Sequence, residues 1–247
     1  MKPYHTGAAR LRAIYQLPTP PGNAAVLELH LSDAGRVMDD QWPAELLVRC
    51  RLTPEVSRPW WAADIKSRPH DCEASYHEPL PFAPGSFDVV LLHHTLDELA
   101  SVFRQKRPRQ VADEWLRQVA SLLRPGGLVV GCALNRTSPG SWLHRARTGS
   151  TIAAAEVRVL SVLSCKAALS NAGFCNPEVF NLLPDASAPL AIASVEAGAS
   201  KRWFRHALDA TRGSLHLPGY LVRKVLVELS LNRFLEGTLF FWGYKPC

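Results

Sequence analysis

Two stretches decide the fold, LPFAPGSFDVVLLHHTLDEL at residues 80–99 and EWLRQVASLLRPGGLVVGCALNR at residues 114–136. Each holds a strongly apolar segment of strand length, at residues 87–92 and 128–134, which is typical of a buried parallel strand. Between these segments, residues 111–123 repeat apolar side chains with the period of a helix. This order predicts a mostly parallel α/β sheet, which binds ligands at the carboxyl ends of its strands.

The same pattern extends in both directions from these stretches. Apolar runs predict further strands at residues 24–29, 44–51 and 177–183, at 190–195, and somewhere within 60–79. A helix is predicted at 157–172, ended by Gly173, and the closing LFFWGYKPC is either a strand or an extended tail. The chain is therefore divided into an N-terminal helix and linker at residues 1–22, an α/β domain at 23–197 and a basic helical extension at 198–247.

Composition narrows the class of protein. Of the 247 residues, 47% are hydrophobic and 20% charged, which is ordinary for a globular protein. Neither a membrane-spanning apolar run nor a secretory leader is present, so we expect a cytoplasmic location. The six cysteines form no CxxC pair, so we expect them to be reduced and mostly buried, and we predict no metal site. The P-loop, HExxH and GxSxG patterns are also absent.

Positive charge gathers at the end of the chain. The net charge is +6, and residues 201–247 hold eight basic against three acidic residues. Helices are predicted at 201–211 and 221–235, the second of them amphipathic, so this part is either a solvated helical face or a surface for a protein partner or a lipid. No RNA-binding motif accompanies the charge, and nucleic acid is not an expected partner.

The two opening stretches resemble the class I S-adenosylmethionine (SAM)-dependent methyltransferases, especially the type 11 branch that includes the ubiquinone and menaquinone methylases. The LPF loop, the SFDVV strand, the LRPGG turn and the strand ending in Asn-Arg follow the family order. The resemblance implies a Rossmann-like, mostly parallel seven-stranded sheet with helices on both faces, here with a C-terminal helical extension. It also implies that SAM binds over the first strands and that the methyl group passes to a small-molecule or lipid-like acceptor, for example in secondary metabolism.

The first family anchor for SAM departs from the pattern. The resemblance places the cofactor beside an E-x-G-x-G-x-G turn, whose glycines let the backbone approach SAM. Glu28 matches the acidic position, while His30 and Ser32 stand at glycine positions. Ala34 stands at the third glycine position, and Gly35 comes one place late.

The other two anchors also differ. The family ends its second strand in an acidic residue that accepts hydrogen bonds from the ribose, and Arg51 occupies that position here. The resemblance also places Leu80 of the LPF motif beside the cofactor. Counting back from it, Tyr76 falls at the position of the aspartate that contacts the adenine. Alternatives for that contact are Asp71, Glu73 and Glu78.

Polar residues follow the strands on the acceptor side. His93 and His94 come at the end of residues 87–92, and histidine suits a general base near neutral pH. Asp97, Asn135 and Arg136 would line the same edge. The alternative is structural, with the histidines packed under the next helix and the Asn-Arg segment forming an ordinary turn.

The altered anchors leave other functions open. A catalytically inactive methyltransferase-like protein would act as a partner-binding or scaffold subunit. A pocket with Arg51 in place of the ribose acceptor would instead favour an anionic ligand.

Overall fold

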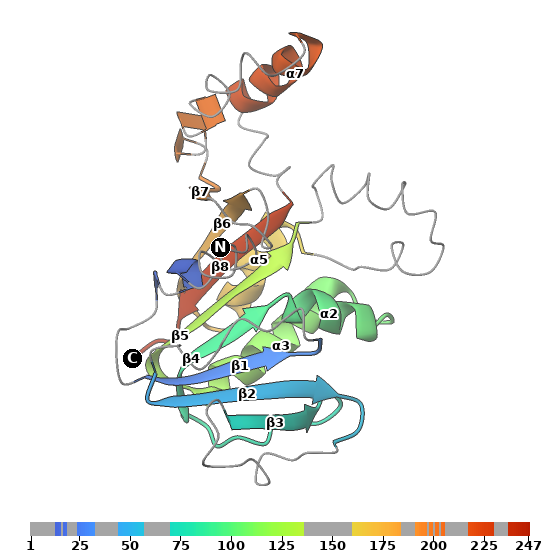
Figure 1. Ribbon diagram of the computed structural model, residues 1–247, viewed down its shortest axis with the longest axis vertical. Helices are drawn as coiled ribbons and strands as arrows, with labels where there is room; N and C mark the ends of the chain where they lie inside the picture. Colours follow the sequence, from blue (N-terminus) through green and yellow to red (C-terminus); the bar gives the residue numbers. More distant parts are fainter. Residues whose placement is uncertain are drawn as a thin grey trace, which may run out of the picture.

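One mixed sheet of eight strands runs through the protein, in the order β3-β2-β1-β4-β5-β8-β6-β7 (Figure 1). The computed structural model describes residues 13–15, 17–18, 24–32, 44–56, 70–135, 160–183, 191–196, 198–199, 201–202, 204–205, 217–229 and 237–247. The strands are β1 (Ala25–His30), β2 (Leu46–Thr53), β3 (His70–Ser75), β4 (Phe87–His93), β5 (Leu123–Leu134), β6 (Cys175–Leu183), β7 (Ala191–Ser194) and β8 (Thr238–Tyr244).

The strand count corrects the expected seven-stranded sheet. Strands β1 to β5 pair in parallel, as expected. The closing stretch becomes β8, which runs antiparallel between β5 and β6, and β7 is an antiparallel edge strand. The adjacent Phe240 and Phe241 point to opposite faces of β8, and both are fully buried. A strand that is apolar on both faces needs an interior position, so the sheet is mixed rather than purely parallel.

The predicted strands lie close to their expected places. Residues 24–29, 44–51 and 87–92 correspond to β1, β2 and β4, and the segment 60–79 contains β3. Strand β5 begins at Leu123, five residues earlier than predicted. The LRPGG segment belongs to the strand and shifts its register with β4 between Phe87 and Val89. The predicted strands at 177–183 and 190–195 correspond to β6 and β7.

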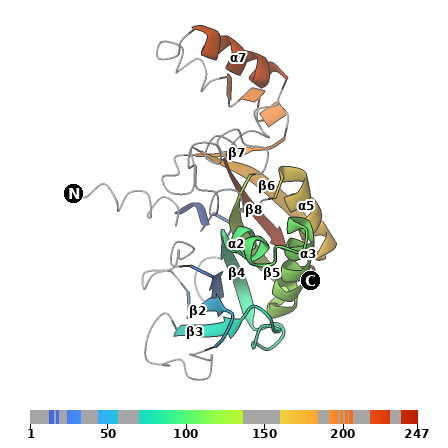
Figure 2. The same cartoon turned by 90° about the vertical axis from the view of Figure 1, so that its right-hand side faces the viewer.

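Three helices cover one face of the sheet, α2 (Thr95–Val102), α3 (Pro108–Leu122) and α5 (Val162–Asn171) (Figure 2). The α3 helix starts before the predicted residue 111, because Pro108 is favourable in a first turn. Gly173 ends α5 with φ of 89°, in the left-handed region that glycine adopts without strain. On the opposite face, the described residues form only one short helical turn, at 13–15. The prediction of helices on both faces is therefore not confirmed for the part of the chain that the structure describes.

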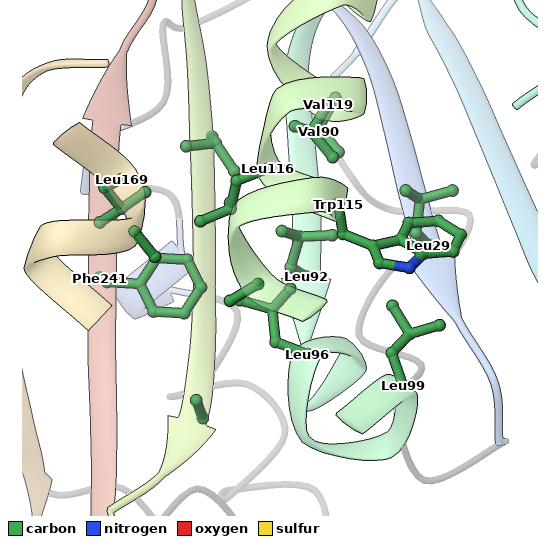
Figure 3. Close-up of a cluster of buried hydrophobic side chains, with 14 of the residues drawn as sticks. Leu29, Val90, Leu92, Leu96, Leu99, Trp115, Leu116, Val119, Leu169 and Phe241 are labelled. Atoms are coloured by element: carbon green, nitrogen blue, oxygen red, sulfur yellow. The ribbon is translucent and has the colours of Figure 1, made fainter. Parts of the chain in front are cut away.

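The main core lies between these helices and the sheet. Figure 3 shows Trp115 and Leu116 of α3 facing Leu29 and Leu92 of the central strands. Gly131 is required on this face, because a Cβ there would lie 2.4 Å from the Leu92 carbonyl oxygen. Fully burying each large apolar side chain contributes about 1.5–3 kcal/mol. The central strands are thus fixed on their helical side.

The second face of the sheet carries a smaller core that brings the N-terminal segment into the fold. Tyr15 is fully buried there, against Phe240 with ring centroids 5.3 Å apart. Val26, Leu91 and Val130 belong to the same cluster. Tyr15 of the N-terminal segment therefore lies over the middle of the sheet, on the same face as His93 and Cys132.

The C-terminal part contains a further helix, α7 (Leu217–Glu228), which lies beyond the β7 edge of the sheet (Figure 1). Its Val227 packs with Ala193 of β7 and with Phe204. The division at residues 22 and 197 stays a prediction, although β8 shows that residues 238–244 belong to the sheet. Within the described residues, no helix is long and apolar enough to cross a membrane.

Four of the six cysteines are buried, as expected, and two are exposed. The exposed pair is Cys175 on β6 and Cys247 at the end of the chain. Cys50 on β2 and Cys72 on β3 are free thiols that lie opposite each other in the strand register. Cys132 lies in the interior of β5, next to the polar residues that form the candidate site.

Candidate functional site

The turn after β1 is tied to the first turn of α2. Glu98 receives a hydrogen bond from the Leu31 amide at 3.3 Å and a second, short one from the Ser32 hydroxyl. The His30 imidazole is buried and folds over its own turn, with Nδ1 3.2 Å from the Ser32 carbonyl oxygen. The side chains of His30 and Ser32, at two of the three predicted glycine positions, are thus engaged within the protein.

Glu28 and Arg51 lie on adjacent strands with very different exposure. Glu28 is fully buried within β1, whereas Arg51 is exposed near the end of β2. Arg51 is the register partner of His30. The cation therefore does lie beside the β1 turn, as the sequence predicts, and a guanidinium group cannot accept a hydrogen bond.

Tyr76 and Leu80 follow β3 and have separate surroundings. Tyr76 is partly buried in an aromatic cluster, with ring centroids 4.6 Å from His77 and 5.8 Å from Phe103. Leu80 is a core residue, and its amide donates to Gln118 Oε1 at 3.4 Å. Tyr76 can offer a ring face to a nucleobase, whereas Leu80 serves the packing.

His93 is the centre of a buried polar cluster at the carboxyl ends of β4 and β5. The Tyr15 hydroxyl oxygen lies 2.8 Å from His93 Nδ1, and Cys132 Sγ lies 2.9 Å from the same atom. Tyr15 comes from the N-terminal segment, and Cys132 is the register partner of His93 on β5. All three side chains are buried on the second face of the sheet.

His94 joins this cluster through an unusual backbone conformation. Its φ is 59°, in the left-handed region that costs a residue other than glycine about 1–2 kcal/mol. Its ring centroid lies 4.7 Å from that of His93. Its Nδ1 lies 3.2 Å from Asp97 Oδ2, and this carboxylate oxygen also accepts the Leu134 amide at 2.7 Å. Asp97 is buried and so holds His94 in place from within the protein.

The cluster is strongly coupled electrostatically. Burial alone would lower the pKa of His94, but the neighbouring Cys132 and Asp97 raise it to about 11. Burial alone would raise the pKa of the Cys132 thiol, but His93 and His94 bring it well below its ordinary value. Burial raises the pKa of Tyr15 and of Asp97. His94 is therefore a cation at neutral pH and a proton donor rather than a base.

The remaining predicted residues are placed as follows. Asn135 is buried after β5, and its amide donates to the Gly237 carbonyl oxygen at 2.9 Å. Its backbone also forms an isolated strand bridge with Leu160. Gly35 and Arg136 lie outside the described residues.

The structure brings His93, His94 and Asp97 together as the sequence suggested, and it adds two residues. Tyr15 and Cys132 were not predicted as site residues. Cys132 sits in an apolar run, and only the strand register that pairs it with His93 reveals its role. Tyr15 carries no local signal, because its position depends on the path of the N-terminal segment.

Comparisons with known proteins support the fold. Residues 51–131, about a third of the chain, match a family model described as a methyltransferase domain. A SAM-dependent methyltransferase from Thermotoga maritima, described as a possible histamine N-methyltransferase, aligns with a TM-score of 0.58 at 13% identity. That alignment covers 98% of this chain and 91% of the other. A search of curated proteins finds no match.

Two further solved structures agree. A SAM-dependent methyltransferase from Archaeoglobus fulgidus has a TM-score of 0.55 at 14% identity, with 96% of this chain and 92% of the other covered. The phosphoethanolamine N-methyltransferase 2 of Haemonchus contortus, solved with SAM, has a TM-score of 0.54 at 12% identity. The alignment covers 97% of this chain but only 53% of the Haemonchus protein, which is longer. The chain has the class I methyltransferase fold.

The described residues fit one part of SAM and not another. SAM carries a positive amino group and a positive sulfonium, and Glu28, Asp97 and Glu98 supply carboxylates near the ends of β1 and β4. Each carboxylate oxygen can accept more than one hydrogen bond. Glu98 can therefore accept a further hydrogen bond in addition to those from the β1 turn. The ribose lacks its usual acceptor, because Arg51 stands there. The cationic part of the cofactor fits better than the ribose.

Proposed function

We propose that this protein is a SAM-dependent methyltransferase that acts on a small-molecule acceptor. The observation that carries the proposal is the polar cluster at the carboxyl ends of β4 and β5, beside the β1 turn. Ligands of open α/β sheets bind at this edge, where the strand order reverses. A buried network of polar groups with mutual contacts is a specified arrangement, and its place at this edge supports a role in binding or catalysis.

SAM, when bound, supplies an electrophilic methyl group. The carboxylates of Glu28 and Glu98 would hold its cationic end beside the β1 turn. On the acceptor side, His93 is the group we assign to removing a proton, since His94 already carries one. Asp97 and Tyr15 keep the two imidazoles oriented. Alignment of the acceptor with the methyl group supplies the rest of the rate.

We further propose an apolar or lipid-like acceptor, such as the ring substrates of the quinone methylase branch or a product of secondary metabolism. Aromatic side chains support this substrate class. The partly buried Trp242 lies 4.4 Å from the Phe180 ring and 5.6 Å from the Phe240 ring, between centroids. Phe240 in turn contacts Tyr15, which contacts His93.

The test is transfer of an isotopically labelled methyl group. The purified chain is incubated with labelled SAM and small-molecule fractions of a cell extract, separated by polarity. We expect label in an apolar fraction, with His93→Ala lowering the rate about 10²–10⁴-fold, as removal of a general base does. The matched control His70→Ala, which removes a histidine at the amino end of β3 and thus away from the carboxyl ends of the strands, should keep the rate. Absence of transfer to every fraction would contradict the proposal.

A second function is favoured by one surface. Leu221 and Val225 of α7 and Leu229, the residue that follows the helix, are 51%, 57% and 62% exposed, at the spacing of one helix face. An inactive scaffold subunit would use such a face, together with basic residues such as Lys224, to bind an acidic protein partner. This alternative predicts no SAM binding and co-elution with another protein that is lost in Val225→Asp.

A further inference from the structure

Three side chains at the ends of β4 and β5 each bring one metal-ligand atom to a common point. These atoms of His93, His94 and Cys132 all lie within 4.8 Å of one another. We propose that they bind a divalent transition-metal ion of the zinc class. Zinc bonds to nitrogen and sulfur are about 2.0–2.3 Å long, so modest side-chain rotations suffice to close the set around an ion.

The backbone is shaped to make this set. Consecutive residues of a strand point to opposite faces, so His93 and His94 would normally diverge. The left-handed conformation of His94 turns its ring toward that of His93 instead. Strand pairing then supplies the third ligand, because Cys132 of β5 lies directly opposite His93. Cys132 follows the two adjacent histidines by 38 and 39 residues, which is why the spacing of the cysteines predicted no metal.

A second shell orients the ligands. Asp97 Oδ2 lies 3.2 Å from His94 Nδ1, which leaves Nε2 of that ring for a metal. Metal-binding histidines usually make such a contact to a carboxylate, and it raises their basicity as ligands. Asp97 is itself buried and fixed by the Leu134 amide.

The ligand chemistry selects the class of ion. Two imidazoles and one thiolate suit zinc, cobalt or copper, whereas magnesium and calcium prefer oxygen ligands. Three protein ligands leave a fourth position open, as in catalytic zinc sites. The Tyr15 hydroxyl, 2.8 Å from His93 Nδ1, is nearby on this side. Metal binding would displace the proton of His94 and occupy a nitrogen of His93, so it would replace the base role proposed for His93 without excluding methyl transfer itself.

Cobalt tests the site directly. The full chain, treated with a chelator and then freed of it, is titrated with Co²⁺ and then with Zn²⁺. We expect one equivalent of Co²⁺ to bind with a cobalt–thiolate charge-transfer band, and Zn²⁺ to displace it. Cys132→Ser should abolish the band, whereas Cys175→Ser, which alters an exposed cysteine, should leave it unchanged. Asp97→Asn should weaken binding about 10–100-fold.

Two results would overturn the site. One is native protein that shows no thiolate band and binds no stoichiometric Co²⁺ at micromolar concentration. The other is an undiminished band in Cys132→Ser, shown by circular dichroism to be folded. If Cys132→Ser does not fold, His94→Gln replaces it, with an undiminished band and affinity again counting against the site. A SAM titration of the same samples separates failure of this site from failure of the proposed methyl transfer.

Discussion

The two halves of the ligand edge are built differently. At the ends of β4 and β5, His93 and Cys132 are buried and contact each other, and Asp97 of the adjoining α2 is buried against His94. Along β1 and β2, a side chain folds over the turn that the family keeps open, and Arg51 is exposed. Buried polar networks are costly unless satisfied, so the first half is a specified structure. If the chain binds SAM as proposed, the comparison predicts an organised acceptor side and a cofactor side that binds SAM weakly.

The largest expected effect tests the support of the organised half. Phe241 is fully buried in β8, next to β5, and Phe241→Ala should lower the free energy of unfolding by about 3–5 kcal/mol. Tyr244→Ala, at the exposed end of the same strand, should change it by less than about 1 kcal/mol. Urea unfolding measures both variants. Equal losses would show that β8 is not an interior strand.

The next effect concerns His94. Its folded pKa of about 11 exceeds the ordinary 6.5, so its contribution to stability is full below pH 6.5 and is lost as pH rises toward 11. His94→Gln should lower the free energy of unfolding at neutral pH by about 1–3 kcal/mol. The difference between native protein and variant should shrink with rising pH. Urea unfolding of both proteins between pH 6.5 and 11, with chelator present, measures this difference in the free energy of unfolding. A difference that does not change with pH would refute the charged state of His94.

The cofactor half should respond in the opposite direction. The double variant His30→Gly/Arg51→Asp removes the side chain over the turn and the cation beside it, and so returns two of the altered positions to the family residues. We expect SAM affinity to rise at least tenfold, since one recovered polar contact contributes about 1–3 kcal/mol. Calorimetry compares it with the control Arg117→Asp, which makes the same charge change at an exposed position of α3. No gain would mean that this half is not a weakened SAM site.

The smallest effect lies away from both halves. Glu228 on α7 is exposed, and its carboxylate forms ion pairs with Arg205 and Lys201. The hydrogen bonds from these two side chains lower the pKa of Glu228 to about 2. Its depressed pKa gives stability that is present above pH 4.5 and lost as pH falls toward 2. Because water screens exposed pairs, Glu228→Gln should leave the unfolding midpoint nearly unchanged at neutral pH. A marked loss would show that α7 contributes more than its contacts indicate.

Sequence reasoning reached the sheet because its evidence is local. Residues 87–92 and 128–134 are apolar over a strand's length, and Gly173 ends a helix by its own backbone preference. The closing stretch stayed ambiguous, because its place between β5 and β6 depends on pairing with strands distant in sequence.

The candidate site was only half predictable for the same reason. His93, His94 and Asp97 follow one strand, so a single segment reveals them. Cys132 joins through the register of β5, and Tyr15 through the path of the N-terminal segment. The left-handed turn at His94 leaves no sequence signature, because the residue is not glycine.

Calorimetric titration of the native chain with SAM tests the central claim most directly. A methyltransferase with an intact acceptor side and a weakened cofactor side should bind one SAM per chain, with a dissociation constant in the high micromolar to low millimolar range. Binding there should also raise the thermal unfolding midpoint. No heat and no shift at millimolar SAM, with the chain folded, would contradict the proposed activity and leave only the fold.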